Sequence, residues 1–247
     1  MSFLDLNRRS LEQVLLSRLS SKEVKNWLGR YAQPYRELMA YYRCAMKEVS
    51  TKFEVLNEEF SLQYDHNPIE TVKTRLKSPD SILDKLTGRQ LPLTVESIEQ
   101  NLSDVAGVRV ICSFPSDIYM LADSFLRQDD ITLIRRKDYI KEPKENGYRS
   151  LHLVIRIPVF LSSHTELVPV EVQIRTIAMD FWASLEHQLR YKSNHETTQQ
   201  LRRRLQHCAE ASAALDREMQ DIYREINGYS AGEAQPVQAE ADEAAPI

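Results

Sequence analysis

Apolar residues recur at intervals of three and four along the first sixty residues, the spacing of one face of an α-helix. Within residues 1–30 the recurring positions are Leu11, Val14, Leu15 and Leu19. Pro34 follows. Because proline lacks the amide proton that a helix interior uses, we expect it to separate this helix from a second one. The second helix carries the stronger pattern, at Leu38, Tyr42, Ala45, Val49, Phe53, Leu56 and Phe60. Residues 1–64 are therefore predicted to be a helical extension.

The middle of the chain changes to the short apolar runs typical of β-strands. Asn67-Pro68 marks a turn, after which we expect a short helix through Arg75 and another from Asp80 or Ser81 to Leu86, ended by Gly88. Strands are expected at Val108–Phe114, Ile131–Arg136, Leu151–Val159 and Leu167–Thr176, with a helix over 118–127. This alternation predicts an α/β sheet covered by helices.

From Ile177 the pattern is helical again, with a break near Ser193-Asn194. The predicted C-terminal helix, 193–227, carries a repeat at Leu201, Leu205, Cys208, Ser212, Leu215, Met219, Ile222 and Ile226. Its steps of four and three define a heptad seam. The seam packs either on its own domain or on a second subunit, and the sequence leaves both alternatives open. Residues 228–247 lack Lys and Arg and are rich in Gly, Ala, Glu and Gln, which predicts a disordered acidic tail.

Composition excludes several classes of protein. The net charge of −4 argues against a general nucleic-acid binder. Three distant cysteines form neither a disulfide framework nor a Cys-x-x-Cys pair. No signal-peptide core and no apolar run of ~18 residues occur. We expect a cytoplasmic protein that binds no membrane.

Two segments are basic although the chain is acidic. Residues 73–89 hold five basic and two acidic side chains, and residues 135–149 hold six and three. They either bind a local anionic ligand or form two solvated faces. The Gly-rich signatures of P-loop and Rossmann nucleotide sites are missing, as are His-Glu-x-x-His and the ligand spacing of a zinc site.

The strand around Glu171 has an informative alternation. Alternate residues of a strand share a face, so Val170, Val172 and Ile174 point into a core. Glu171, Gln173 and Arg175 then point together to the other side. This polar row is either the wet face of an antiparallel strand or the floor of a site. In a site, a carboxylate held near cations can take the proton of an attacking hydroxyl.

Two further segments carry candidate chemistry. Asp104 enters the strand that contains Gly107 and Arg109; a carboxylate there suits Mg²⁺, although a helix cap or turn is the simpler reading. In the polar connection from Lys137 to His152, the turn signal Asn146-Gly147 precedes Tyr148-Arg149. An aromatic ring beside cations suits a purine and its phosphates, and a ring packed on the sheet is the alternative.

In combination these motifs resemble the RelA/SpoT-type (p)ppGpp synthetase domain. The resemblance spans residues 65–192, and the motif sequences are most similar to those of the RelP-like branch of the small alarmone synthetases. The motifs are Arg75-x-Lys77-x-x-x-Ser81-x-x-x-Lys85, Asp104-x-Ala-Gly-x-Arg109, Asn-Gly-Tyr148-Arg149-Ser-x-His152, Glu171-x-Gln173-x-Arg175-Thr176 and Trp182-Ala-x-x-Glu186-His187.

The resemblance implies an α+β fold, with a mixed sheet of about five strands of nucleotidyltransferase type flanked by helices. It implies pyrophosphate transfer from ATP to GDP or GTP with Mg²⁺. It also implies homotetramers. On the ATP side, Arg75 and Arg109 would sandwich the adenine, and Lys77, Ser81 and Lys85 would hold the phosphates. On the GDP or GTP side, Tyr148 would stack on the guanine, and Lys137, Lys144, Arg149 and His152 would line the phosphates and ribose. Glu171, with Gln173 beside it, would accept the 3′-hydroxyl proton, and Asp104 and Glu171 would be the metal-binding carboxylates.

The sequence departs from the family at two positions. Gly88 stands where a relative has Arg, and Arg89 is expected to replace that ATP-phosphate contact. Asp180 stands where the relative has Asn at the guanine. No His-Asp pair of the family's hydrolase motif occurs, so we expect synthesis without hydrolysis. The alternatives are a nucleotidyltransferase with another acceptor, a non-catalytic nucleotide sensor, and a helical interaction module.

Overall fold

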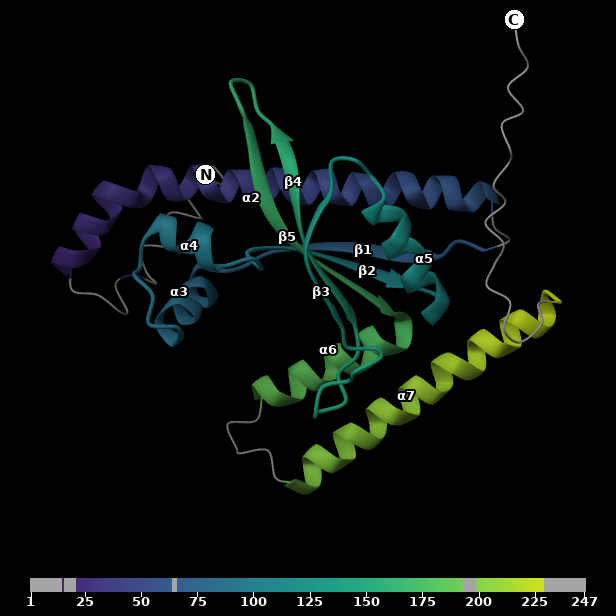
Figure 1. Cartoon of the computed structure of the whole chain (residues 1–247). Helices are drawn as coiled ribbons and strands as arrows, with labels where there is room; N and C mark the ends of the chain where they lie inside the picture. Colours follow the sequence, from purple (N-terminus) through teal and green to yellow (C-terminus); the bar gives the residue numbers. More distant parts are fainter. Residues whose placement is uncertain (1–14, 16–20, 64–65, 193–198, 229–247) are drawn as a thin grey trace, which may run out of the picture.

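The computed structural model describes residue 15 and residues 21–63, 66–192 and 199–228 (Figure 1). The elements are α2 (Ser21–Gln63), β1 (Ile69–Leu76), α3 (Pro79–Gly88), α4 (Val95–Asn101), β2 (Ala106–Cys112), α5 (Pro115–Leu126), β3 (Thr132–Asp138), β4 (Leu151–Phe160), β5 (Thr165–Thr176), α6 (Ile177–Lys192) and α7 (Gln199–Ile226). Five strands form one sheet in the order β1-β2-β5-β4-β3. Strands β2 and β5 are parallel, and the other neighbours are antiparallel. The expected mixed sheet flanked by helices is confirmed.

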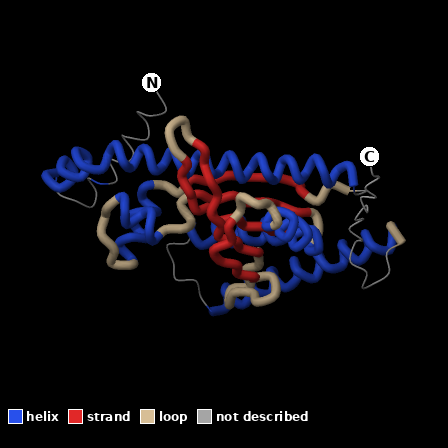
Figure 2. The backbone as a smooth tube through the Cα atoms, turned by 45° about the horizontal axis from the view of Figure 1, so that its top comes forward, coloured by secondary structure: helices blue, strands red, loops and turns tan. Residues whose placement is uncertain are grey.

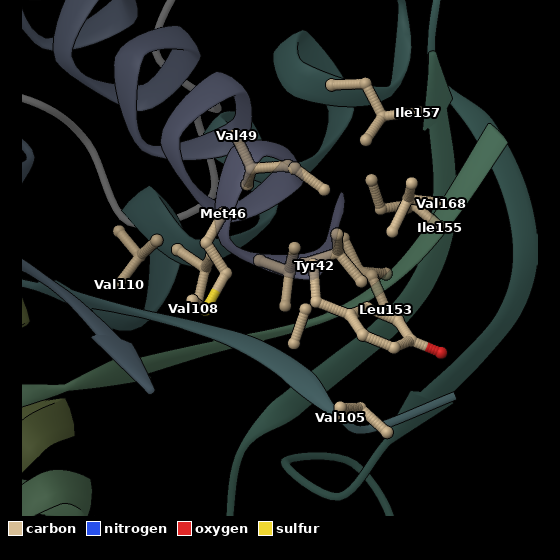
Figure 3. Close-up of a cluster of buried hydrophobic side chains, with 14 of the residues drawn as sticks. Tyr42, Met46, Val49, Val105, Val108, Val110, Leu153, Ile155, Ile157 and Val168 are labelled. Atoms are coloured by element: carbon tan, nitrogen blue, oxygen red, sulfur yellow. The ribbon is translucent and has the colours of Figure 1, made fainter. Parts of the chain in front are cut away.

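The hydrophobic core lies between one face of this sheet and helix α2. Figure 3 shows Tyr42, Met46 and Val49 of α2 among valine, leucine and isoleucine side chains of the strands. Helix α5 lies beside α2, where the rings of Phe53 and Phe125 stack with centroids 4.4 Å apart. In Figures 1 and 2 most of the sheet lies between α2 and α7, and the β4–β5 hairpin extends past α2. One face of the sheet is thus sealed by apolar packing, which leaves the other face for polar side chains.

Pro34 does not separate two helices, because it lies inside the continuous helix α2. Aromatic packing spans the proline: the ring of Trp27 lies 5.6 Å from that of Tyr31 and 5.9 Å from that of Tyr35. The indole of Trp27 also donates a hydrogen bond to the carbonyl of Leu93. This packing offsets the hydrogen bond that proline removes, and the purple end of α2 turns away from the line of the remainder (Figure 1).

The expected short helix through Arg75 is wrong, because these residues form the edge strand β1. The β-branched residues Ile69, Thr71, Val72 and Thr74 favour a strand, and pairing with β2 completes it. Helix α4 was not expected. Its sequence signals are the capping hydroxyl of Thr94, which accepts from the amide of Ser97, and the buried residues Val95 and Ile98 at helical spacing.

Most of the heptad seam of α7 does not pack on its own domain: Leu215 and Met219 are 58% and 51% exposed, whereas Leu205 packs against Trp182 and its neighbours. The face of α7 that meets the domain is shifted by one residue and carries Ala209, Ala213 and Asp216, which are buried. Two of these side chains have identified partners: Asp216 accepts from the hydroxyl of Thr176, and Ala209 packs against Trp182 and Ala183. The seam thus packs on its own domain only in part, and its packing on a second subunit stays a prediction.

Several expectations fall on residues outside the described ranges. These are most of the N-terminal helix over 1–30, the break near Ser193-Asn194 and the acidic tail beyond residue 228. Among the described helices, none has the length and apolar character needed to cross a bilayer.

Candidate functional site

The polar face of the sheet carries a row of functional side chains, one from each strand. Strand register places them side by side in the order Lys73, Arg109, Gln173, His152 and Lys137. Residues paired directly across neighbouring strands share a face of the sheet. The adjacent row, which runs through Arg75, Gly107, Glu171, Val154 and Arg135, lies on the same face. The predicted alternation of β5 is therefore confirmed, and its polar side is the floor of a larger surface.

A cavity of about 730 Å³ lies on this face, a volume typical of small-molecule sites. Asp104 and Glu171 both line it, so the two candidate carboxylates share one space. The charged lining residues are Lys73, Arg75, Lys77, Asp104, Arg109, Glu171, Arg175 and Glu186. Because cations outnumber carboxylates, the cavity suits an anionic ligand.

Asp104 is held between two lysines. Its Oδ2 accepts hydrogen bonds from the Nζ of Lys77 at 2.8 Å and of Lys85 at 2.6 Å. Burial raises the pKa of Asp104, but the two lysines outweigh it and hold the pKa below its usual value. The other oxygen, Oδ1, is buried and has no hydrogen-bond partner. A carboxylate with one unused oxygen fits a magnesium ligand, because Mg²⁺ takes one or two protein carboxylates and completes its shell with phosphates and water.

Glu171 is oriented by its neighbours on two strands. The Nε2 of Gln173 donates to its Oε2 at 2.9 Å, and the Nδ1 of His152 lies 3.4 Å from its Oε1. Burial raises the pKa of Glu171, but the contacts with His152 and Gln173 outweigh it, so the net pKa is lowered. The surroundings of Glu171 thus favour its ionised form, and each of its oxygens has a polar neighbour.

A closed ring of polar contacts connects Glu171 to Tyr148. The Nε2 of His152 lies 2.8 Å from the Tyr148 hydroxyl, which also accepts from the Nη2 of Arg175 at 2.7 Å. The same Nη2 donates to the Oε1 of Gln173 at 2.6 Å. The Nε2 of Gln173 donates to Glu171, and this contact closes the ring. Arg175 is only 4% exposed. These contacts fix the aromatic ring and the carboxylate relative to each other.

Asp180 lies among three cations. Its Oδ1 is 3.2 Å from the Nη1 atoms of both Arg109 and Arg175, and its Oδ2 is 3.7 Å from the Nζ of Lys73. In this arrangement Asp180 orients the guanidinium groups at the cavity wall. Its role toward guanine stays a prediction.

The connection between β3 and β4 is ordered around Lys144. Its ammonium group lies 4.6 Å from the ring centroid of Tyr139 and 4.8 Å from that of Tyr148, within range of cation–π attraction. The predicted turn at Asn146-Gly147 is present: the side chain of Asn146 accepts from the Tyr148 amide, and Gly147 has a φ of 87°. We call residues 139–150 the acceptor loop below.

Eight predicted residues lie outside the cavity lining: Ser81, Lys85, Arg89, Lys137, Lys144, Arg149, His152 and Asp180. Four of these, Lys85, Lys144, His152 and Asp180, contact residues that line the cavity. Arg89 donates to the carbonyl of Asn101 at 2.8 Å, and Ser81 lies at the first turn of α3, where its hydroxyl contacts Ser78. Arg149 turns toward α7 and donates to the carbonyl of Ala209. Lys137 is exposed on β3, in register with His152. Their contacts with nucleotide stay predictions.

Two cations at the cavity, Lys73 and Arg175, have no role assigned by the sequence patterns. The signal for Arg175 is its place on the same strand face as Glu171. The signal for Lys73 exists only when residues 69–76 are taken as a strand, because register with β2 then sets Lys73 beside Arg109. Among the described residues, no group of three or more His, Cys, Asp or Glu side chains is arranged to hold a metal ion without added ligands.

Comparison with known proteins gives concordant matches. Residues 74–196 match the family described as a region found in RelA/SpoT proteins. The GTP pyrophosphokinase YwaC of Bacillus subtilis is 43% identical over 195 residues, which cover 79% of this chain and 93% of that protein. The crystal structure of small alarmone synthetase 1 from Bacillus subtilis bound to its product pppGpp matches with a TM-score of 0.72 and 38% identity, over 78% of this chain and 98% of that one.

A second crystal structure, that of small alarmone synthetase 2 from Bacillus subtilis, matches with a TM-score of 0.71 and 44% identity, over 78% of this chain and 99% of that one. Sequence identity at this level over nearly the whole length of each relative indicates common ancestry as well as a common fold. The chain therefore belongs to the RelA/SpoT family.

Proposed function

We propose that this protein transfers the β,γ-pyrophosphate of ATP to the 3′-hydroxyl of GDP or GTP, which yields AMP and ppGpp or pppGpp. The observation that carries the proposal is that Asp104 and Glu171 share one cation-lined cavity. Relatives named GTP pyrophosphokinase or small alarmone synthetase match most of the chain.

ATP occupies the part of the cavity formed by β1, β2 and Asp104, and α3 lies beside it through the contact of Lys85 with Asp104. Arg75 and Arg109 face it from neighbouring strands and hold the adenine between their guanidinium planes. Lys77 and Lys85, which neutralise Asp104 in the free protein, bind the phosphates. Ser81 and Arg89 assist from the two ends of α3.

Mg²⁺ is the cofactor in this proposal. The unpartnered Oδ1 of Asp104 and the carboxylate of Glu171 are the protein oxygens that hold it, and the nucleotide phosphates supply further ligands. When bound, the ion neutralises phosphate charge in the transition state.

The guanosine nucleotide occupies the side of the acceptor loop. Tyr148 stacks on the guanine, Lys144 lies beside its ring, and His152 and Lys137 extend the cationic row toward the edge of the sheet. Arg149 and Asp180 complete the contacts with phosphate and base.

Glu171 performs the proton transfer. Its carboxylate takes the proton of the 3′-hydroxyl as that oxygen bonds to the β-phosphorus of ATP and the bond from this phosphorus to the α-phosphate oxygen breaks. Phosphoryl-type transfer leaves the protein mainly positioning and charge stabilisation. Alignment of two nucleotides supplies ~7–11 kcal/mol, and a positioned base adds ~10²–10⁴-fold in rate.

The same proposal covers the chain beyond the site. Residues 65–192 form the synthetase domain, 1–64 and 193–227 are helical extensions, and 228–247 are an acidic tail. The exposed seam of α7 is the surface through which the chain forms a homotetramer in the cytoplasm. Synthesis proceeds without hydrolase activity.

The test is direct. The purified protein is incubated with ATP, Mg²⁺ and either GDP or GTP, and the products are separated by anion exchange. The expected outcome is equal amounts of AMP and a 3′-pyrophosphorylated guanosine nucleotide, and no product with the Glu171→Gln variant. AMP formed only with another acceptor would assign the site to a different nucleotidyltransferase.

A further inference from the structure

Helix α7 approaches the acceptor loop more closely than a side chain on the loop would permit. A Cβ atom placed on Gly147 would lie 2.5 Å from the Cβ of Ala209, which is closer than two non-bonded carbon atoms can approach. The φ of Gly147, 87°, also favours glycine. Ala209 is buried, with 4% of its surface exposed. The absence of a side chain on one partner and a single methyl on the other allow the two backbones to meet.

Hydrogen bonds join the same turn of α7 to residues beside the cavity. The Nη1 of Arg149 donates to the carbonyl of Ala209 at 3.3 Å, and the indole of Trp182 donates to the carbonyl of Leu205 at 2.9 Å. The ring of Tyr148 packs against the small cluster of Trp182, Ala183 and Ala209, which is separate from the main core. Tyr148 and Arg149 therefore take their positions from α7 as well as from the sheet.

The rest of α7 is anchored to the rigid body of the fold. Asp216 accepts from the hydroxyl of Thr176 at 2.6 Å, directly beside Arg175 of the polar ring. Gln220 accepts from the amide of Ser116 at the start of α5. These contacts fix the helix along its length, so the turn at Ala209 is a firm support for the loop.

From these contacts we infer that α7 positions the acceptor loop and that Ala209 is the positioning residue through which it acts. The inference rests on the proposed function, because it assigns the affinity for the guanosine nucleotide to a helix that does not line the cavity. Displacement of Tyr148 by about 1 Å costs up to ~10²-fold in rate when the geometry of two substrates is critical. Within the described part of the chain, the contacts of Ala209 are with the acceptor loop and α6 and not with β1, β2 or α3.

The test compares three leucine substitutions on α7. Ala209→Leu places bulk at Gly147, Ala213→Leu places it at a buried position one turn further along, and Ala211→Leu places it on the exposed surface. We expect Ala209→Leu to raise the KM for GDP or GTP about tenfold or more and to leave the KM for ATP within about twofold. The other two variants should leave the ratio of the two KM values unchanged.

Hydrogen exchange of the free variants provides a readout independent of chemistry. Ala209→Leu should speed exchange of amides in residues 139–150 and leave β4 and β5 as in wild type, and Ala209→Ser should restore the wild-type behaviour. Equal changes in both KM values, or the same loop exchange in Ala213→Leu, would overturn the inference. If Ala209→Leu does not fold, Ala209→Val tests the same contact with less added bulk. A wild type that makes no guanosine product refutes the proposed function, and the exchange measurement still decides whether Ala209 supports the loop.

Discussion

Replacement of Glu171 by glutamine removes a proton acceptor from the cavity and leaves its shape unchanged. The amide oxygen of the new side chain can accept from the Nε2 of Gln173, which now lies 2.9 Å from a carboxylate oxygen. The amide nitrogen then faces the Nδ1 of His152, which is 3.4 Å away. The side chain keeps its size and its contact with Gln173, so the expected loss lies in proton transfer and in the negative charge offered to Mg²⁺.

The magnitude follows from the role of a general base. Its removal costs about 10²–10⁴ in kcat, or about 3–5 kcal/mol of activation free energy. Thermal stability at neutral pH should fall slightly, because the contacts with His152 and Gln173 outweigh burial and favour the ionised carboxylate in the folded state, a contribution that the neutral amide lacks. Affinity for both nucleotides should persist.

The assay measures initial rates of AMP formation together with nucleotide binding by calorimetry. Glu166→Gln is the matched control, since it lies on the same strand, five residues away, and pairs with His164 instead of lining the cavity. Turnover of the Glu171 variant within about threefold of wild type would show that another group takes the proton, because a positioned base accounts for at least ~10²-fold. Loss of guanosine-nucleotide binding would show that Glu171 has a structural role instead.

Three further outcomes are expected. In the Asp104→Asn variant, Mg²⁺-dependent turnover should fall by about 10²-fold or more, because the substitution removes the carboxylate charge that binds Mg²⁺ and balances Lys77 and Lys85. An unchanged rate profile in a magnesium titration would refute the metal role. Tyr148→Ala should weaken GDP or GTP binding by ~1–3 kcal/mol and leave ATP unaffected, whereas Tyr148→Phe keeps the stacking ring and loses only the hydroxyl contacts with His152 and Arg175; equal losses for both nucleotides would indicate a packing role. Because the folded-state pKa values of Asp104 and Glu171 are lowered from 3.8 and 4.5, their contribution to stability is complete above these values and is lost as the pH falls through the lower folded values. In urea unfolding, the free-energy difference between wild type and Glu171→Gln should therefore decrease below about pH 4.5, and an increase would contradict the assignment.

Local periodicity determined much of this protein. The alternation of β5 separated Glu171, Gln173 and Arg175 from the core without any knowledge of the sheet, because side chains of a strand alternate whatever it pairs with. Asn146-Gly147 determined a turn because its backbone conformation is a property of the residues themselves.

Where two local signals competed, tertiary packing decided. Pro34 has a local tendency to end a helix, and contacts of Trp27 with rings beyond it kept α2 continuous. Residues 69–76 carry both charged and β-branched residues, and the exposed edge of β2 settled them as a strand. The apolar repeat of α7 indicated its most hydrophobic face, whereas the face that meets the domain is the one with small side chains.

The candidate site also depends partly on local sequence and partly on tertiary structure. The sequence by itself supplied the two carboxylates, the acceptor loop and the cations as separate segments. Only strand register and the placement of α3 brought Lys85 to Asp104 and His152 to Glu171, and only the docking of α7 set Ala209 against Gly147. The physical reason is that periodicity is fixed by a residue and its near neighbours in the chain. Which faces meet depends on the packing of segments far apart in sequence.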